Sequence, residues 1–187
     1  MAYIKSTGNF FKTFLKQRKQ IGAWAPSSRF LVKKMCAKID FKSARNIIEL
    51  GPGTGVFTEE ILKLAHPDSK IFVFELNDDF YELLNEKFND KRLILIKGSA
   101  EQMKTVLDEH GINEADAILS SLPLAMIPDD IKNNIIDTAY TVLKKDALFI
   151  QYQYTLNAKK CLEQRFGKMK ISFAAINIPP AFIYCAV

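Results

Sequence analysis

From residue 46 onward, short apolar runs alternate with segments in which apolar residues recur at helical spacing. The runs indicate strands, because they are short and are bounded by glycine, proline or charged residues. The apolar runs lie at residues 46–50, 70–75, 93–97, 115–120 and 147–154, and the helical segments after them at residues 54–64, 78–88, 102–110, 129–143 and 158–166. This alternation predicts a parallel sheet with helices on both faces.

Two further apolar runs, at residues 169–178 and 181–187, meet at Pro179 and Pro180. A connection this short can join only antiparallel strands. We therefore expect an α/β fold with a Rossmann-like, mostly parallel seven-stranded sheet and an antiparallel terminal strand. A length of 187 residues without repeats or low-complexity linkers suits one structural domain.

The first 45 residues form a separate region in this pattern, a basic helical arm that precedes the main domain at residues 46–187. One amphipathic helix is expected around residues 9–21 and a second from Ser27 or Ser28 to about Lys38. Eleven basic residues and a single acidic one give the arm a charge of +10, whereas the main domain carries −5. A basic arm on an acidic body predicts an anionic partner, either nucleic acid or a membrane surface.

The helix at residues 9–21 has phenylalanines on one side and lysines on the other. This pattern is typical of a helix that lies in an anionic membrane interface, although a helix that covers the sheet would show it too. RNA is less favoured, because the arm has no arginine-rich run and no motif that stacks aromatic residues on bases. The residues that we expect to contact the membrane are Phe11, Lys12, Phe14, Lys16 and Lys19.

Residues 46–55 hold the most informative motif, a strand that ends in Glu49-Leu50 and opens onto Gly51, Gly53 and Gly55. Alternate glycines let the backbone turn sharply and lie against a ligand where a side chain would collide. The dinucleotide fingerprint requires a further glycine or alanine, and a phosphate-binding P-loop requires Gly-Lys-Ser/Thr; neither is present. The motif therefore predicts binding of S-adenosylmethionine, with S-adenosylhomocysteine as product.

The tips of the first four strands are expected to line the cofactor site, because ligands of such sheets sit at the carboxyl ends of the strands. Glu75 ends the second strand, where a carboxylate takes the ribose hydroxyls, and Leu76 would pack on the adenine ring or make an ordinary core contact. Ser99 would bond the exocyclic amine of the adenine. The expected cofactor-binding residues are Glu49, Gly51, Gly53, Thr54, Gly55, Glu75, Leu76, Ser99, Ala100 and Ser120.

Residues 121–124, Ser-Leu-Pro-Leu, follow the fourth strand and are expected beside the reactive methyl group. Enzymes that methylate the amino group of a planar base place Asn or Asp, then Pro, then an aromatic residue here. Ser121 and Leu124 replace them, and leucine gives no stacking platform, which disfavours a nucleobase. We expect Ser121, Tyr154 and Tyr184 to contact the acceptor, the tyrosines by cation–π attraction to a methylated amine.

Three cysteines without metal-ligand spacing indicate free thiols in a reducing compartment, and no metal site is expected. No apolar run approaches the length of a membrane-spanning helix, and no secretory signal is evident. We therefore expect a cytoplasmic protein.

Four motifs together resemble the bacterial phospholipid N-methyltransferases, a family related to the ribosomal RNA adenine dimethylases. They are residues 22–28, the Glu49–Gly55 loop, residues 121–124 and residues 177–181, Asn-Ile-Pro-Pro-Ala. The resemblance implies stepwise methylation of phosphatidylethanolamine by an enzyme bound peripherally to the inner face of the cell membrane through its N-terminal helix. It also implies Glu49, Gly51, Gly53 and Glu75 as cofactor contacts, whereas Ser99 departs from the Asp often found at its position.

Three functions thus remain open. The first is an N-methyltransferase of a lipid amine, with phosphatidylethanolamine and its mono- and dimethyl forms as acceptors. The second keeps the chemistry but acts on an rRNA adenine or a small molecule. The third is a membrane-binding module that holds the cofactor without turnover.

Overall fold

Residues 28–187 are described by the structure, a computed structural model, and contain a seven-stranded sheet in the order β3-β2-β1-β4-β5-β7-β6. The pairs among β1 to β5 are parallel, and β7 is antiparallel to both of its neighbours. The strands are β1 (Asn46–Leu50), β2 (Lys70–Glu75), β3 (Leu93–Lys97), β4 (Ala115–Ser120), β5 (Leu143–Gln153), β6 (Lys170–Ala174) and β7 (Ala181–Ala186). This is the predicted α/β fold.

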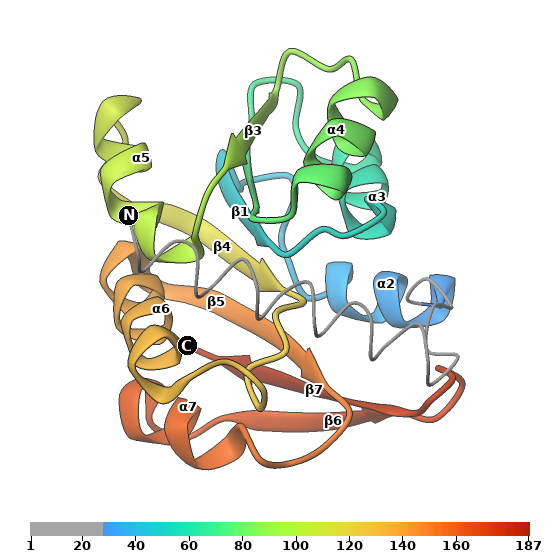
Figure 1. Cartoon of the computed structure of the whole chain (residues 1–187), viewed down its shortest axis with the longest axis vertical. Coiled ribbons are helices and arrows are strands. Elements are labelled where there is room, and N and C mark those ends of the chain that lie inside the picture. The colour runs from blue at the N-terminus through green and yellow to red at the C-terminus, as the bar shows by residue number, and fades with distance from the viewer. Residues whose placement is uncertain (1–27) are drawn as a thin grey trace.

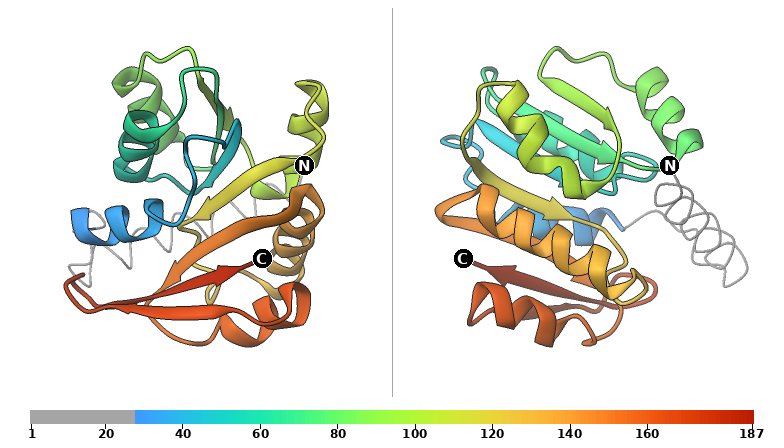
Figure 2. Two further views of the ribbon diagram at one scale, coloured as in Figure 1. Left: turned by 180° about the vertical axis from the view of Figure 1, so that it is seen from behind. Right: turned by 60° about the vertical axis from the view of Figure 1, so that its left-hand side comes forward.

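Helices cover both faces of the sheet (Figures 1 and 2). One face carries α2 (Arg29–Cys36), α3 (Val56–Leu64) and α4 (Asp78–Lys87); the other carries the short 3-10 helix η1 (Ala100–Gln102), α5 (Met103–Glu109), α6 (Asp129–Val142) and α7 (Lys159–Phe166). Alternate residues of a strand point into the apolar layers on the two faces of the sheet. Ile47 packs with the α2 and α3 side, and Ile48 with the α5 to α7 side.

The order in which strands are added to the sheet reverses between β3 and β4. It first proceeds outward from β1 through β2 to β3, and then crosses back so that β4 pairs with the other side of β1. The loops that follow β1 and β4 therefore diverge at the carboxyl ends of adjacent parallel strands. Such a switch point is where ligands bind in open α/β sheets.

The hairpin of β6 and β7 brings a turn to this same edge of the sheet. Because β7 is antiparallel to both β5 and β6, β6 runs in the direction of β5. Ala174, the last residue of β6, and Ala181, the first of β7, pair beside the turn. The turn at residues 175–180 thus lies at the edge that also carries the carboxyl ends of the parallel strands.

Most predicted strand bounds are confirmed, and the exceptions have local causes. β5 begins at Leu143 instead of residue 147, with a bulge opposite Ala115 and Ala117 and a positive φ of 66° at Asp146. The polar residues 144–146 break the apolar pattern there, although the backbone continues the strand. The run predicted at residues 169–178 ends at Ala174, because the chain then turns toward β7.

Helix α2, which sequence patterning assigns to the arm, is part of the folded core. Ser28 caps it by accepting a hydrogen bond from the Leu31 amide, 3.2 Å away, as predicted. Leu31 and Met35 are fully buried among residues of α3 and the sheet. Among the described residues, no helix combines the length and apolar character that crossing a membrane requires.

Candidate active site

The loop after β1 has the backbone shape that its glycines predict. Gly51, Gly53 and Gly55 have φ values of 70°, 58° and 77°, which lie in the left-handed region. A Cβ on Gly51 would lie 2.9 Å from the Cδ2 atom of Leu122, and a Cβ on Gly55 would lie 2.6 Å from the Phe88 ring. Gly53 differs, because a Cβ there would meet nothing within 4 Å. The backbone at Gly53 therefore borders open space that a ligand can use.

Glu75 joins the end of β2 to this loop. Its Oε2 atom accepts a hydrogen bond from the Gly53 amide at 3.3 Å, and Oε1 accepts one from the Asn77 amide at 2.8 Å. The side chain is almost fully buried, and burial raises its pKa to about 7, although both amides oppose the rise. A carboxylate held this way beside the glycine loop has the position that a ribose-binding acid needs.

Glu49 is a second buried acid at the end of the neighbouring strand. It is fully buried, and neither carboxylate oxygen makes a hydrogen bond of normal geometry within residues 28–187. Burial raises its pKa to about 8; the Thr58 hydroxyl opposes part of the rise, and the charge of Glu75 adds to it. Unpartnered buried acceptors are costly, so Glu49 has unused capacity to receive hydrogen bonds from a ligand.

A cavity with about 450 Å³ of space, part of it open to solvent, lies at the carboxyl ends of β1, β2 and β3. Its rim comes from the glycine loop, from β2, from the residues after β3 and from the first turns of α6. The lining residues are Gly51, Phe74, Glu75, Leu76, Gly98, Ser99, Ala100, Leu122, Ile127, Pro128, Ile131 and Ile135. The wall is mostly apolar with a few polar groups, as is usual for a site that binds a small molecule.

Five of the ten predicted cofactor residues line this cavity, namely Gly51, Glu75, Leu76, Ser99 and Ala100. The Ser99 hydroxyl is already engaged, because it accepts from the Glu101 amide at 3.3 Å and donates to Glu101 Oε2 at 3.0 Å. Five do not line the cavity: Gly53, Thr54 and Gly55 lie in the glycine loop, and Glu49 and Ser120 lie at the carboxyl ends of β1 and β4. Ser120 is fully buried, and its hydroxyl accepts from the Leu122 amide at 3.3 Å.

The loop after β4, residues 121–124, is fixed by two buried glutamines that the sequence analysis did not identify. Gln151 and Gln153 on β5 each donate a side-chain hydrogen bond to the Leu122 carbonyl, at 3.0 and 2.7 Å. The Ser121 amide donates to the Leu50 carbonyl at 2.9 Å and ties this loop to the end of β1. The available signal is the spacing of two glutamines at i and i+2 in the apolar second half of the strand, which places both on one face.

The three residues predicted to contact the acceptor have different surroundings. The Ser121 hydroxyl is buried and has no hydrogen-bond partner among the described residues. Tyr154 is partly buried at the end of β5, where its ring meets Tyr152 edge-on at 5.8 Å. Tyr184 is fully buried, and its hydroxyl donates to the Thr155 carbonyl at 2.9 Å. This position gives Tyr184 a structural role in the core in place of the predicted acceptor contact.

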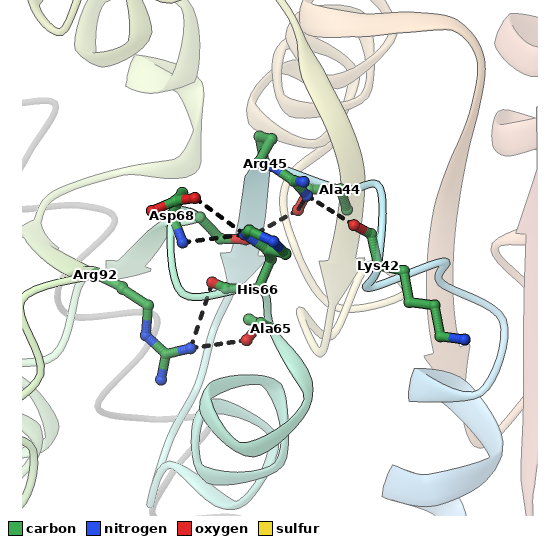
Figure 3. Close-up of polar contacts among 8 residues, drawn as sticks. Lys42, Ala44, Arg45, Ala65, His66, Asp68 and Arg92 are labelled. Carbon is green, nitrogen blue, oxygen red and sulfur yellow. Dashed lines mark hydrogen bonds and ion pairs between the residues drawn. The ribbon is translucent and has the colours of Figure 1, made fainter.

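Neither histidine lies at the edge formed by the carboxyl ends of the parallel strands, as predicted. His110 follows α5, and His66 follows α3 at the opposite edge, near Arg45 and Arg92 (Figure 3). There Arg92 donates to the carbonyls of Ala65 and His66, and the His66 ring accepts from the Asp68 amide. This cluster lies at the amino ends of the strands, and none of its residues lines the cavity.

Residues 28–187 contain no group of His, Cys, Asp or Glu side chains that is arranged to hold a metal ion. The predicted membrane contacts Phe11, Lys12, Phe14, Lys16 and Lys19 lie outside the described residues, as does the whole helix predicted at residues 9–21.

Comparison with known proteins links most of the chain to methyltransferases. Residues 15–171 match the sequence model described as ribosomal RNA adenine dimethylase. The ornithine lipid N-methyltransferase of Singulisphaera acidiphila is 30% identical over 177 residues, which cover 94% of this chain and 92% of that protein. The ribosomal RNA small subunit methyltransferase A of Dehalococcoides mccartyi is 37% identical over 95 residues, but this chain spans only about a third of it.

Among solved structures, the fold resembles the 1,6-didemethyltoxoflavin-N1-methyltransferase of Burkholderia thailandensis, which was crystallised with S-adenosylhomocysteine. The TM-score is 0.70 over 97% of this chain and 88% of that protein, at 11% identity. At this identity the likeness concerns the fold.

Proposed function

Because the chain belongs to the ribosomal RNA adenine dimethylase family, whose members are S-adenosylmethionine-dependent methyltransferases, we propose that it methylates the amine of a membrane lipid. The observation that carries this proposal is the extent of the match to the ornithine lipid enzyme, which covers more than nine tenths of both chains. The rRNA enzymes instead share only part of their length with this chain.

S-adenosylmethionine is the cofactor, and the residues at the edge of the sheet fit it. The open backbone at Gly53, the buried acid Glu75 and the apolar cavity have the properties that its sugar and adenine parts require. Glu49 would offer unsatisfied acceptors to its positively charged groups. When bound, the cofactor supplies a methyl group on a sulfonium sulfur, which a neutral amine takes by in-line displacement. The protein mainly has to orient the amine and exclude water.

The loop at residues 121–124 would hold the amine. The unpartnered Ser121 hydroxyl can accept one N–H of a primary amine, and the clamped Leu122 carbonyl keeps the loop in one position. Leu124 is 1% exposed and is part of the core, so this position presents no ring on which a base could stack. Tyr154 would face the amine, which gains a positive charge when it takes the methyl group.

Two lipid amines are candidates for the acceptor. The family resemblance of the four motifs favours phosphatidylethanolamine, and the match to the Singulisphaera enzyme favours the amine of ornithine lipid. Both present a primary amine at a membrane surface, where the basic arm at residues 1–45 would hold the enzyme peripherally on the inner face of the cell membrane.

An rRNA adenine is the second candidate acceptor, and the match of residues 15–171 to the adenine dimethylase model is the observation that favours it. Transfer of label from S-adenosylmethionine to lipid separates the two lipid amines. Vesicles that contain phosphatidylethanolamine, vesicles that contain ornithine lipid and amine-free vesicles are incubated in parallel with the protein. Label in the lipid extract of one amine-containing sample identifies the acceptor. Label in none of them contradicts the proposal.

A further inference from the structure

The turn between β6 and β7 exposes two large apolar side chains at the edge of the sheet that carries the active site. Ile178 is 81% exposed and Ile176 66%, and Phe30 at the start of α2 is 43% exposed. We call these three residues the turn patch. Single exposed apolar residues are common, but three on two tethered segments form a surface that calls for a partner.

The turn is held rigidly with its polar side chain inward and its apolar side chains outward. Asn177 is 2% exposed; its Oδ1 atom accepts from the Ser28 amide at 3.0 Å, and its Nδ2 atom donates to the Pro179 carbonyl at 2.7 Å. Asn177 is thus turned inward, whereas its neighbours Ile176 and Ile178 are exposed. This arrangement is the reverse of an ordinary turn, whose polar residues face water.

Two lysines of α2 lie beside the turn patch. Lys34 Nζ donates to the Phe173 carbonyl at 2.7 Å and lies 5.9 Å from the centre of the Phe30 ring, and Lys33 beside it is exposed. Neither segment that builds the patch, residues 28–39 and 164–187, contains an Asp or Glu. Exposed apolar groups beside lysines match the interface of an anionic bilayer, where apolar groups enter the acyl boundary and lysines stay at the headgroups.

Three features meet at this edge. The turn patch lies at the carboxyl edge of the sheet, as do the cavity and the loop at residues 121–124. Ser28, whose amide donates to Asn177, follows residues 1–27 in the chain, which hold five basic residues and no acidic one. A bilayer that contacts the turn patch would therefore face the acceptor loop.

We propose that the turn patch inserts into the interface of an anionic lipid bilayer and so presents the carboxyl edge of the sheet to the headgroups. This inference rests on the proposed lipid substrate, but it concerns docking, so it can be tested on vesicles that contain no methyl acceptor. Vesicles of phosphatidylglycerol and phosphatidylcholine carry negative charge and no primary amine.

The first test compares two double variants of the full chain in binding to these vesicles. Ile176→Ser with Ile178→Ser removes the apolar side chains of the turn. Leu64→Ser with Val187→Ser is the matched control, because these residues are 45% and 62% exposed at the opposite edge. We expect binding to weaken about tenfold or more in the turn variant and by less than about twofold in the control. Equal binding by the turn variant and the unchanged chain would overturn the proposal.

The second test reports insertion of the turn itself, through the emission of a fluorophore attached to it. In a Cys161→Ala background, an environment-sensitive fluorophore is attached at Ile178→Cys and, separately, at Val187→Cys. We expect a blue shift on addition of anionic vesicles at position 178 and none at position 187. A label at 178 that is already shifted without vesicles would mean that the arm or a second copy covers the patch, and would contradict the proposal.

The two hypotheses fail separately. Methyl transfer to lipid without a shift at position 178 would overturn the docking proposal and leave the lipid substrate standing. A shift at position 178 without lipid methylation would support docking and overturn the lipid substrate.

The triple change of Lys12, Lys16 and Lys19 to Glu measures what the arm adds to vesicle binding. Loss of binding in that variant, together with unchanged binding in the turn variant, would assign docking to the arm.

Discussion

The Gly53 amide donates to Oε2 of Glu75 across 3.3 Å, so the glycine loop after β1 and the end of β2 are held together by the acid assigned to the ribose. We expect Glu75→Ala to weaken S-adenosylmethionine binding by about 1–3 kcal/mol, because a charge-assisted hydrogen bond is lost. Isothermal titration calorimetry measures this directly. Glu75→Gln is the matched variant, and an unaltered dissociation constant in both would refute the ribose assignment.

Two buried acids make stability and cofactor affinity change in opposite directions with pH. Burial raises the pKa of Glu49 to about 8 and that of Glu75 to about 7, from an ordinary value of 4.5. The folded state therefore holds protons that the unfolded state has released, and the free energy of unfolding decreases as pH rises from about 5 through these values. The ionised acids are the forms that attract a positively charged cofactor, so its affinity increases over the same interval.

The Glu49→Gln variant tests this pH linkage. Removal of one ionisable group should flatten the decrease in melting temperature between about pH 5 and pH 8 and raise the melting temperature at the upper end. The number of protons released on cofactor binding, measured by calorimetry in buffers of different ionisation enthalpy, should also decrease. A melting temperature that rises with pH in the unchanged protein would contradict the raised pKa values.

Gly53 and Gly111 form a matched pair of positions that tests whether the cofactor lies against the backbone at Gly53. Both have positive φ, 58° and 68°, and a Cβ on either would meet nothing within 4 Å. Alanine should therefore cost about 1–2 kcal/mol of stability at each position through backbone strain alone. Only Gly53→Ala should weaken cofactor binding, because Gly111 follows α5 away from the cavity. Equal cofactor affinity in the two variants would place the ligand elsewhere.

Gln153 is predicted to act on the acceptor loop without touching the cofactor. Gln153→Met keeps about the same length but removes the donor to the Leu122 carbonyl. We expect kcat to decrease about tenfold or more while the dissociation constant of S-adenosylmethionine changes little, because one buried carbonyl loses a hydrogen bond and the loop shifts. Lys132→Gln, an exchange in α6 that leaves the Leu122 contacts intact, serves as the control. A parallel loss of cofactor affinity in Gln153→Met would indicate a general structural defect.

The sequence predicted those parts of the fold that depend on local signals. The bounds of β1 to β4 agree because the apolar runs there end at glycine or polar residues. The three glycines predict sharp turns of the backbone, and all three have positive φ in the structure. β5 starts earlier than predicted, because its first residues are polar and are held in the sheet by pairing with β4.

The parts of the site that the sequence did not predict depend on contacts between distant segments. Gln151 and Gln153 reach the Leu122 carbonyl across 29 and 31 residues, and α6 supplies one wall of the cavity. Residue type alone predicts Tyr184 at the acceptor, but its position on β7 opposite Gln151 buries it in the core. Side-chain destinations of this kind follow from sheet register, which local patterns do not fix.

The most direct measurement is a competition in one tube. The protein is incubated with labelled S-adenosylmethionine, vesicles that contain phosphatidylethanolamine and ornithine lipid, and unmethylated small ribosomal subunits; lipid and RNA are then extracted separately. The lipid-amine account predicts label in the lipid fraction and none above background in the RNA. Label in the RNA, with the lipid fraction unlabelled, would contradict it.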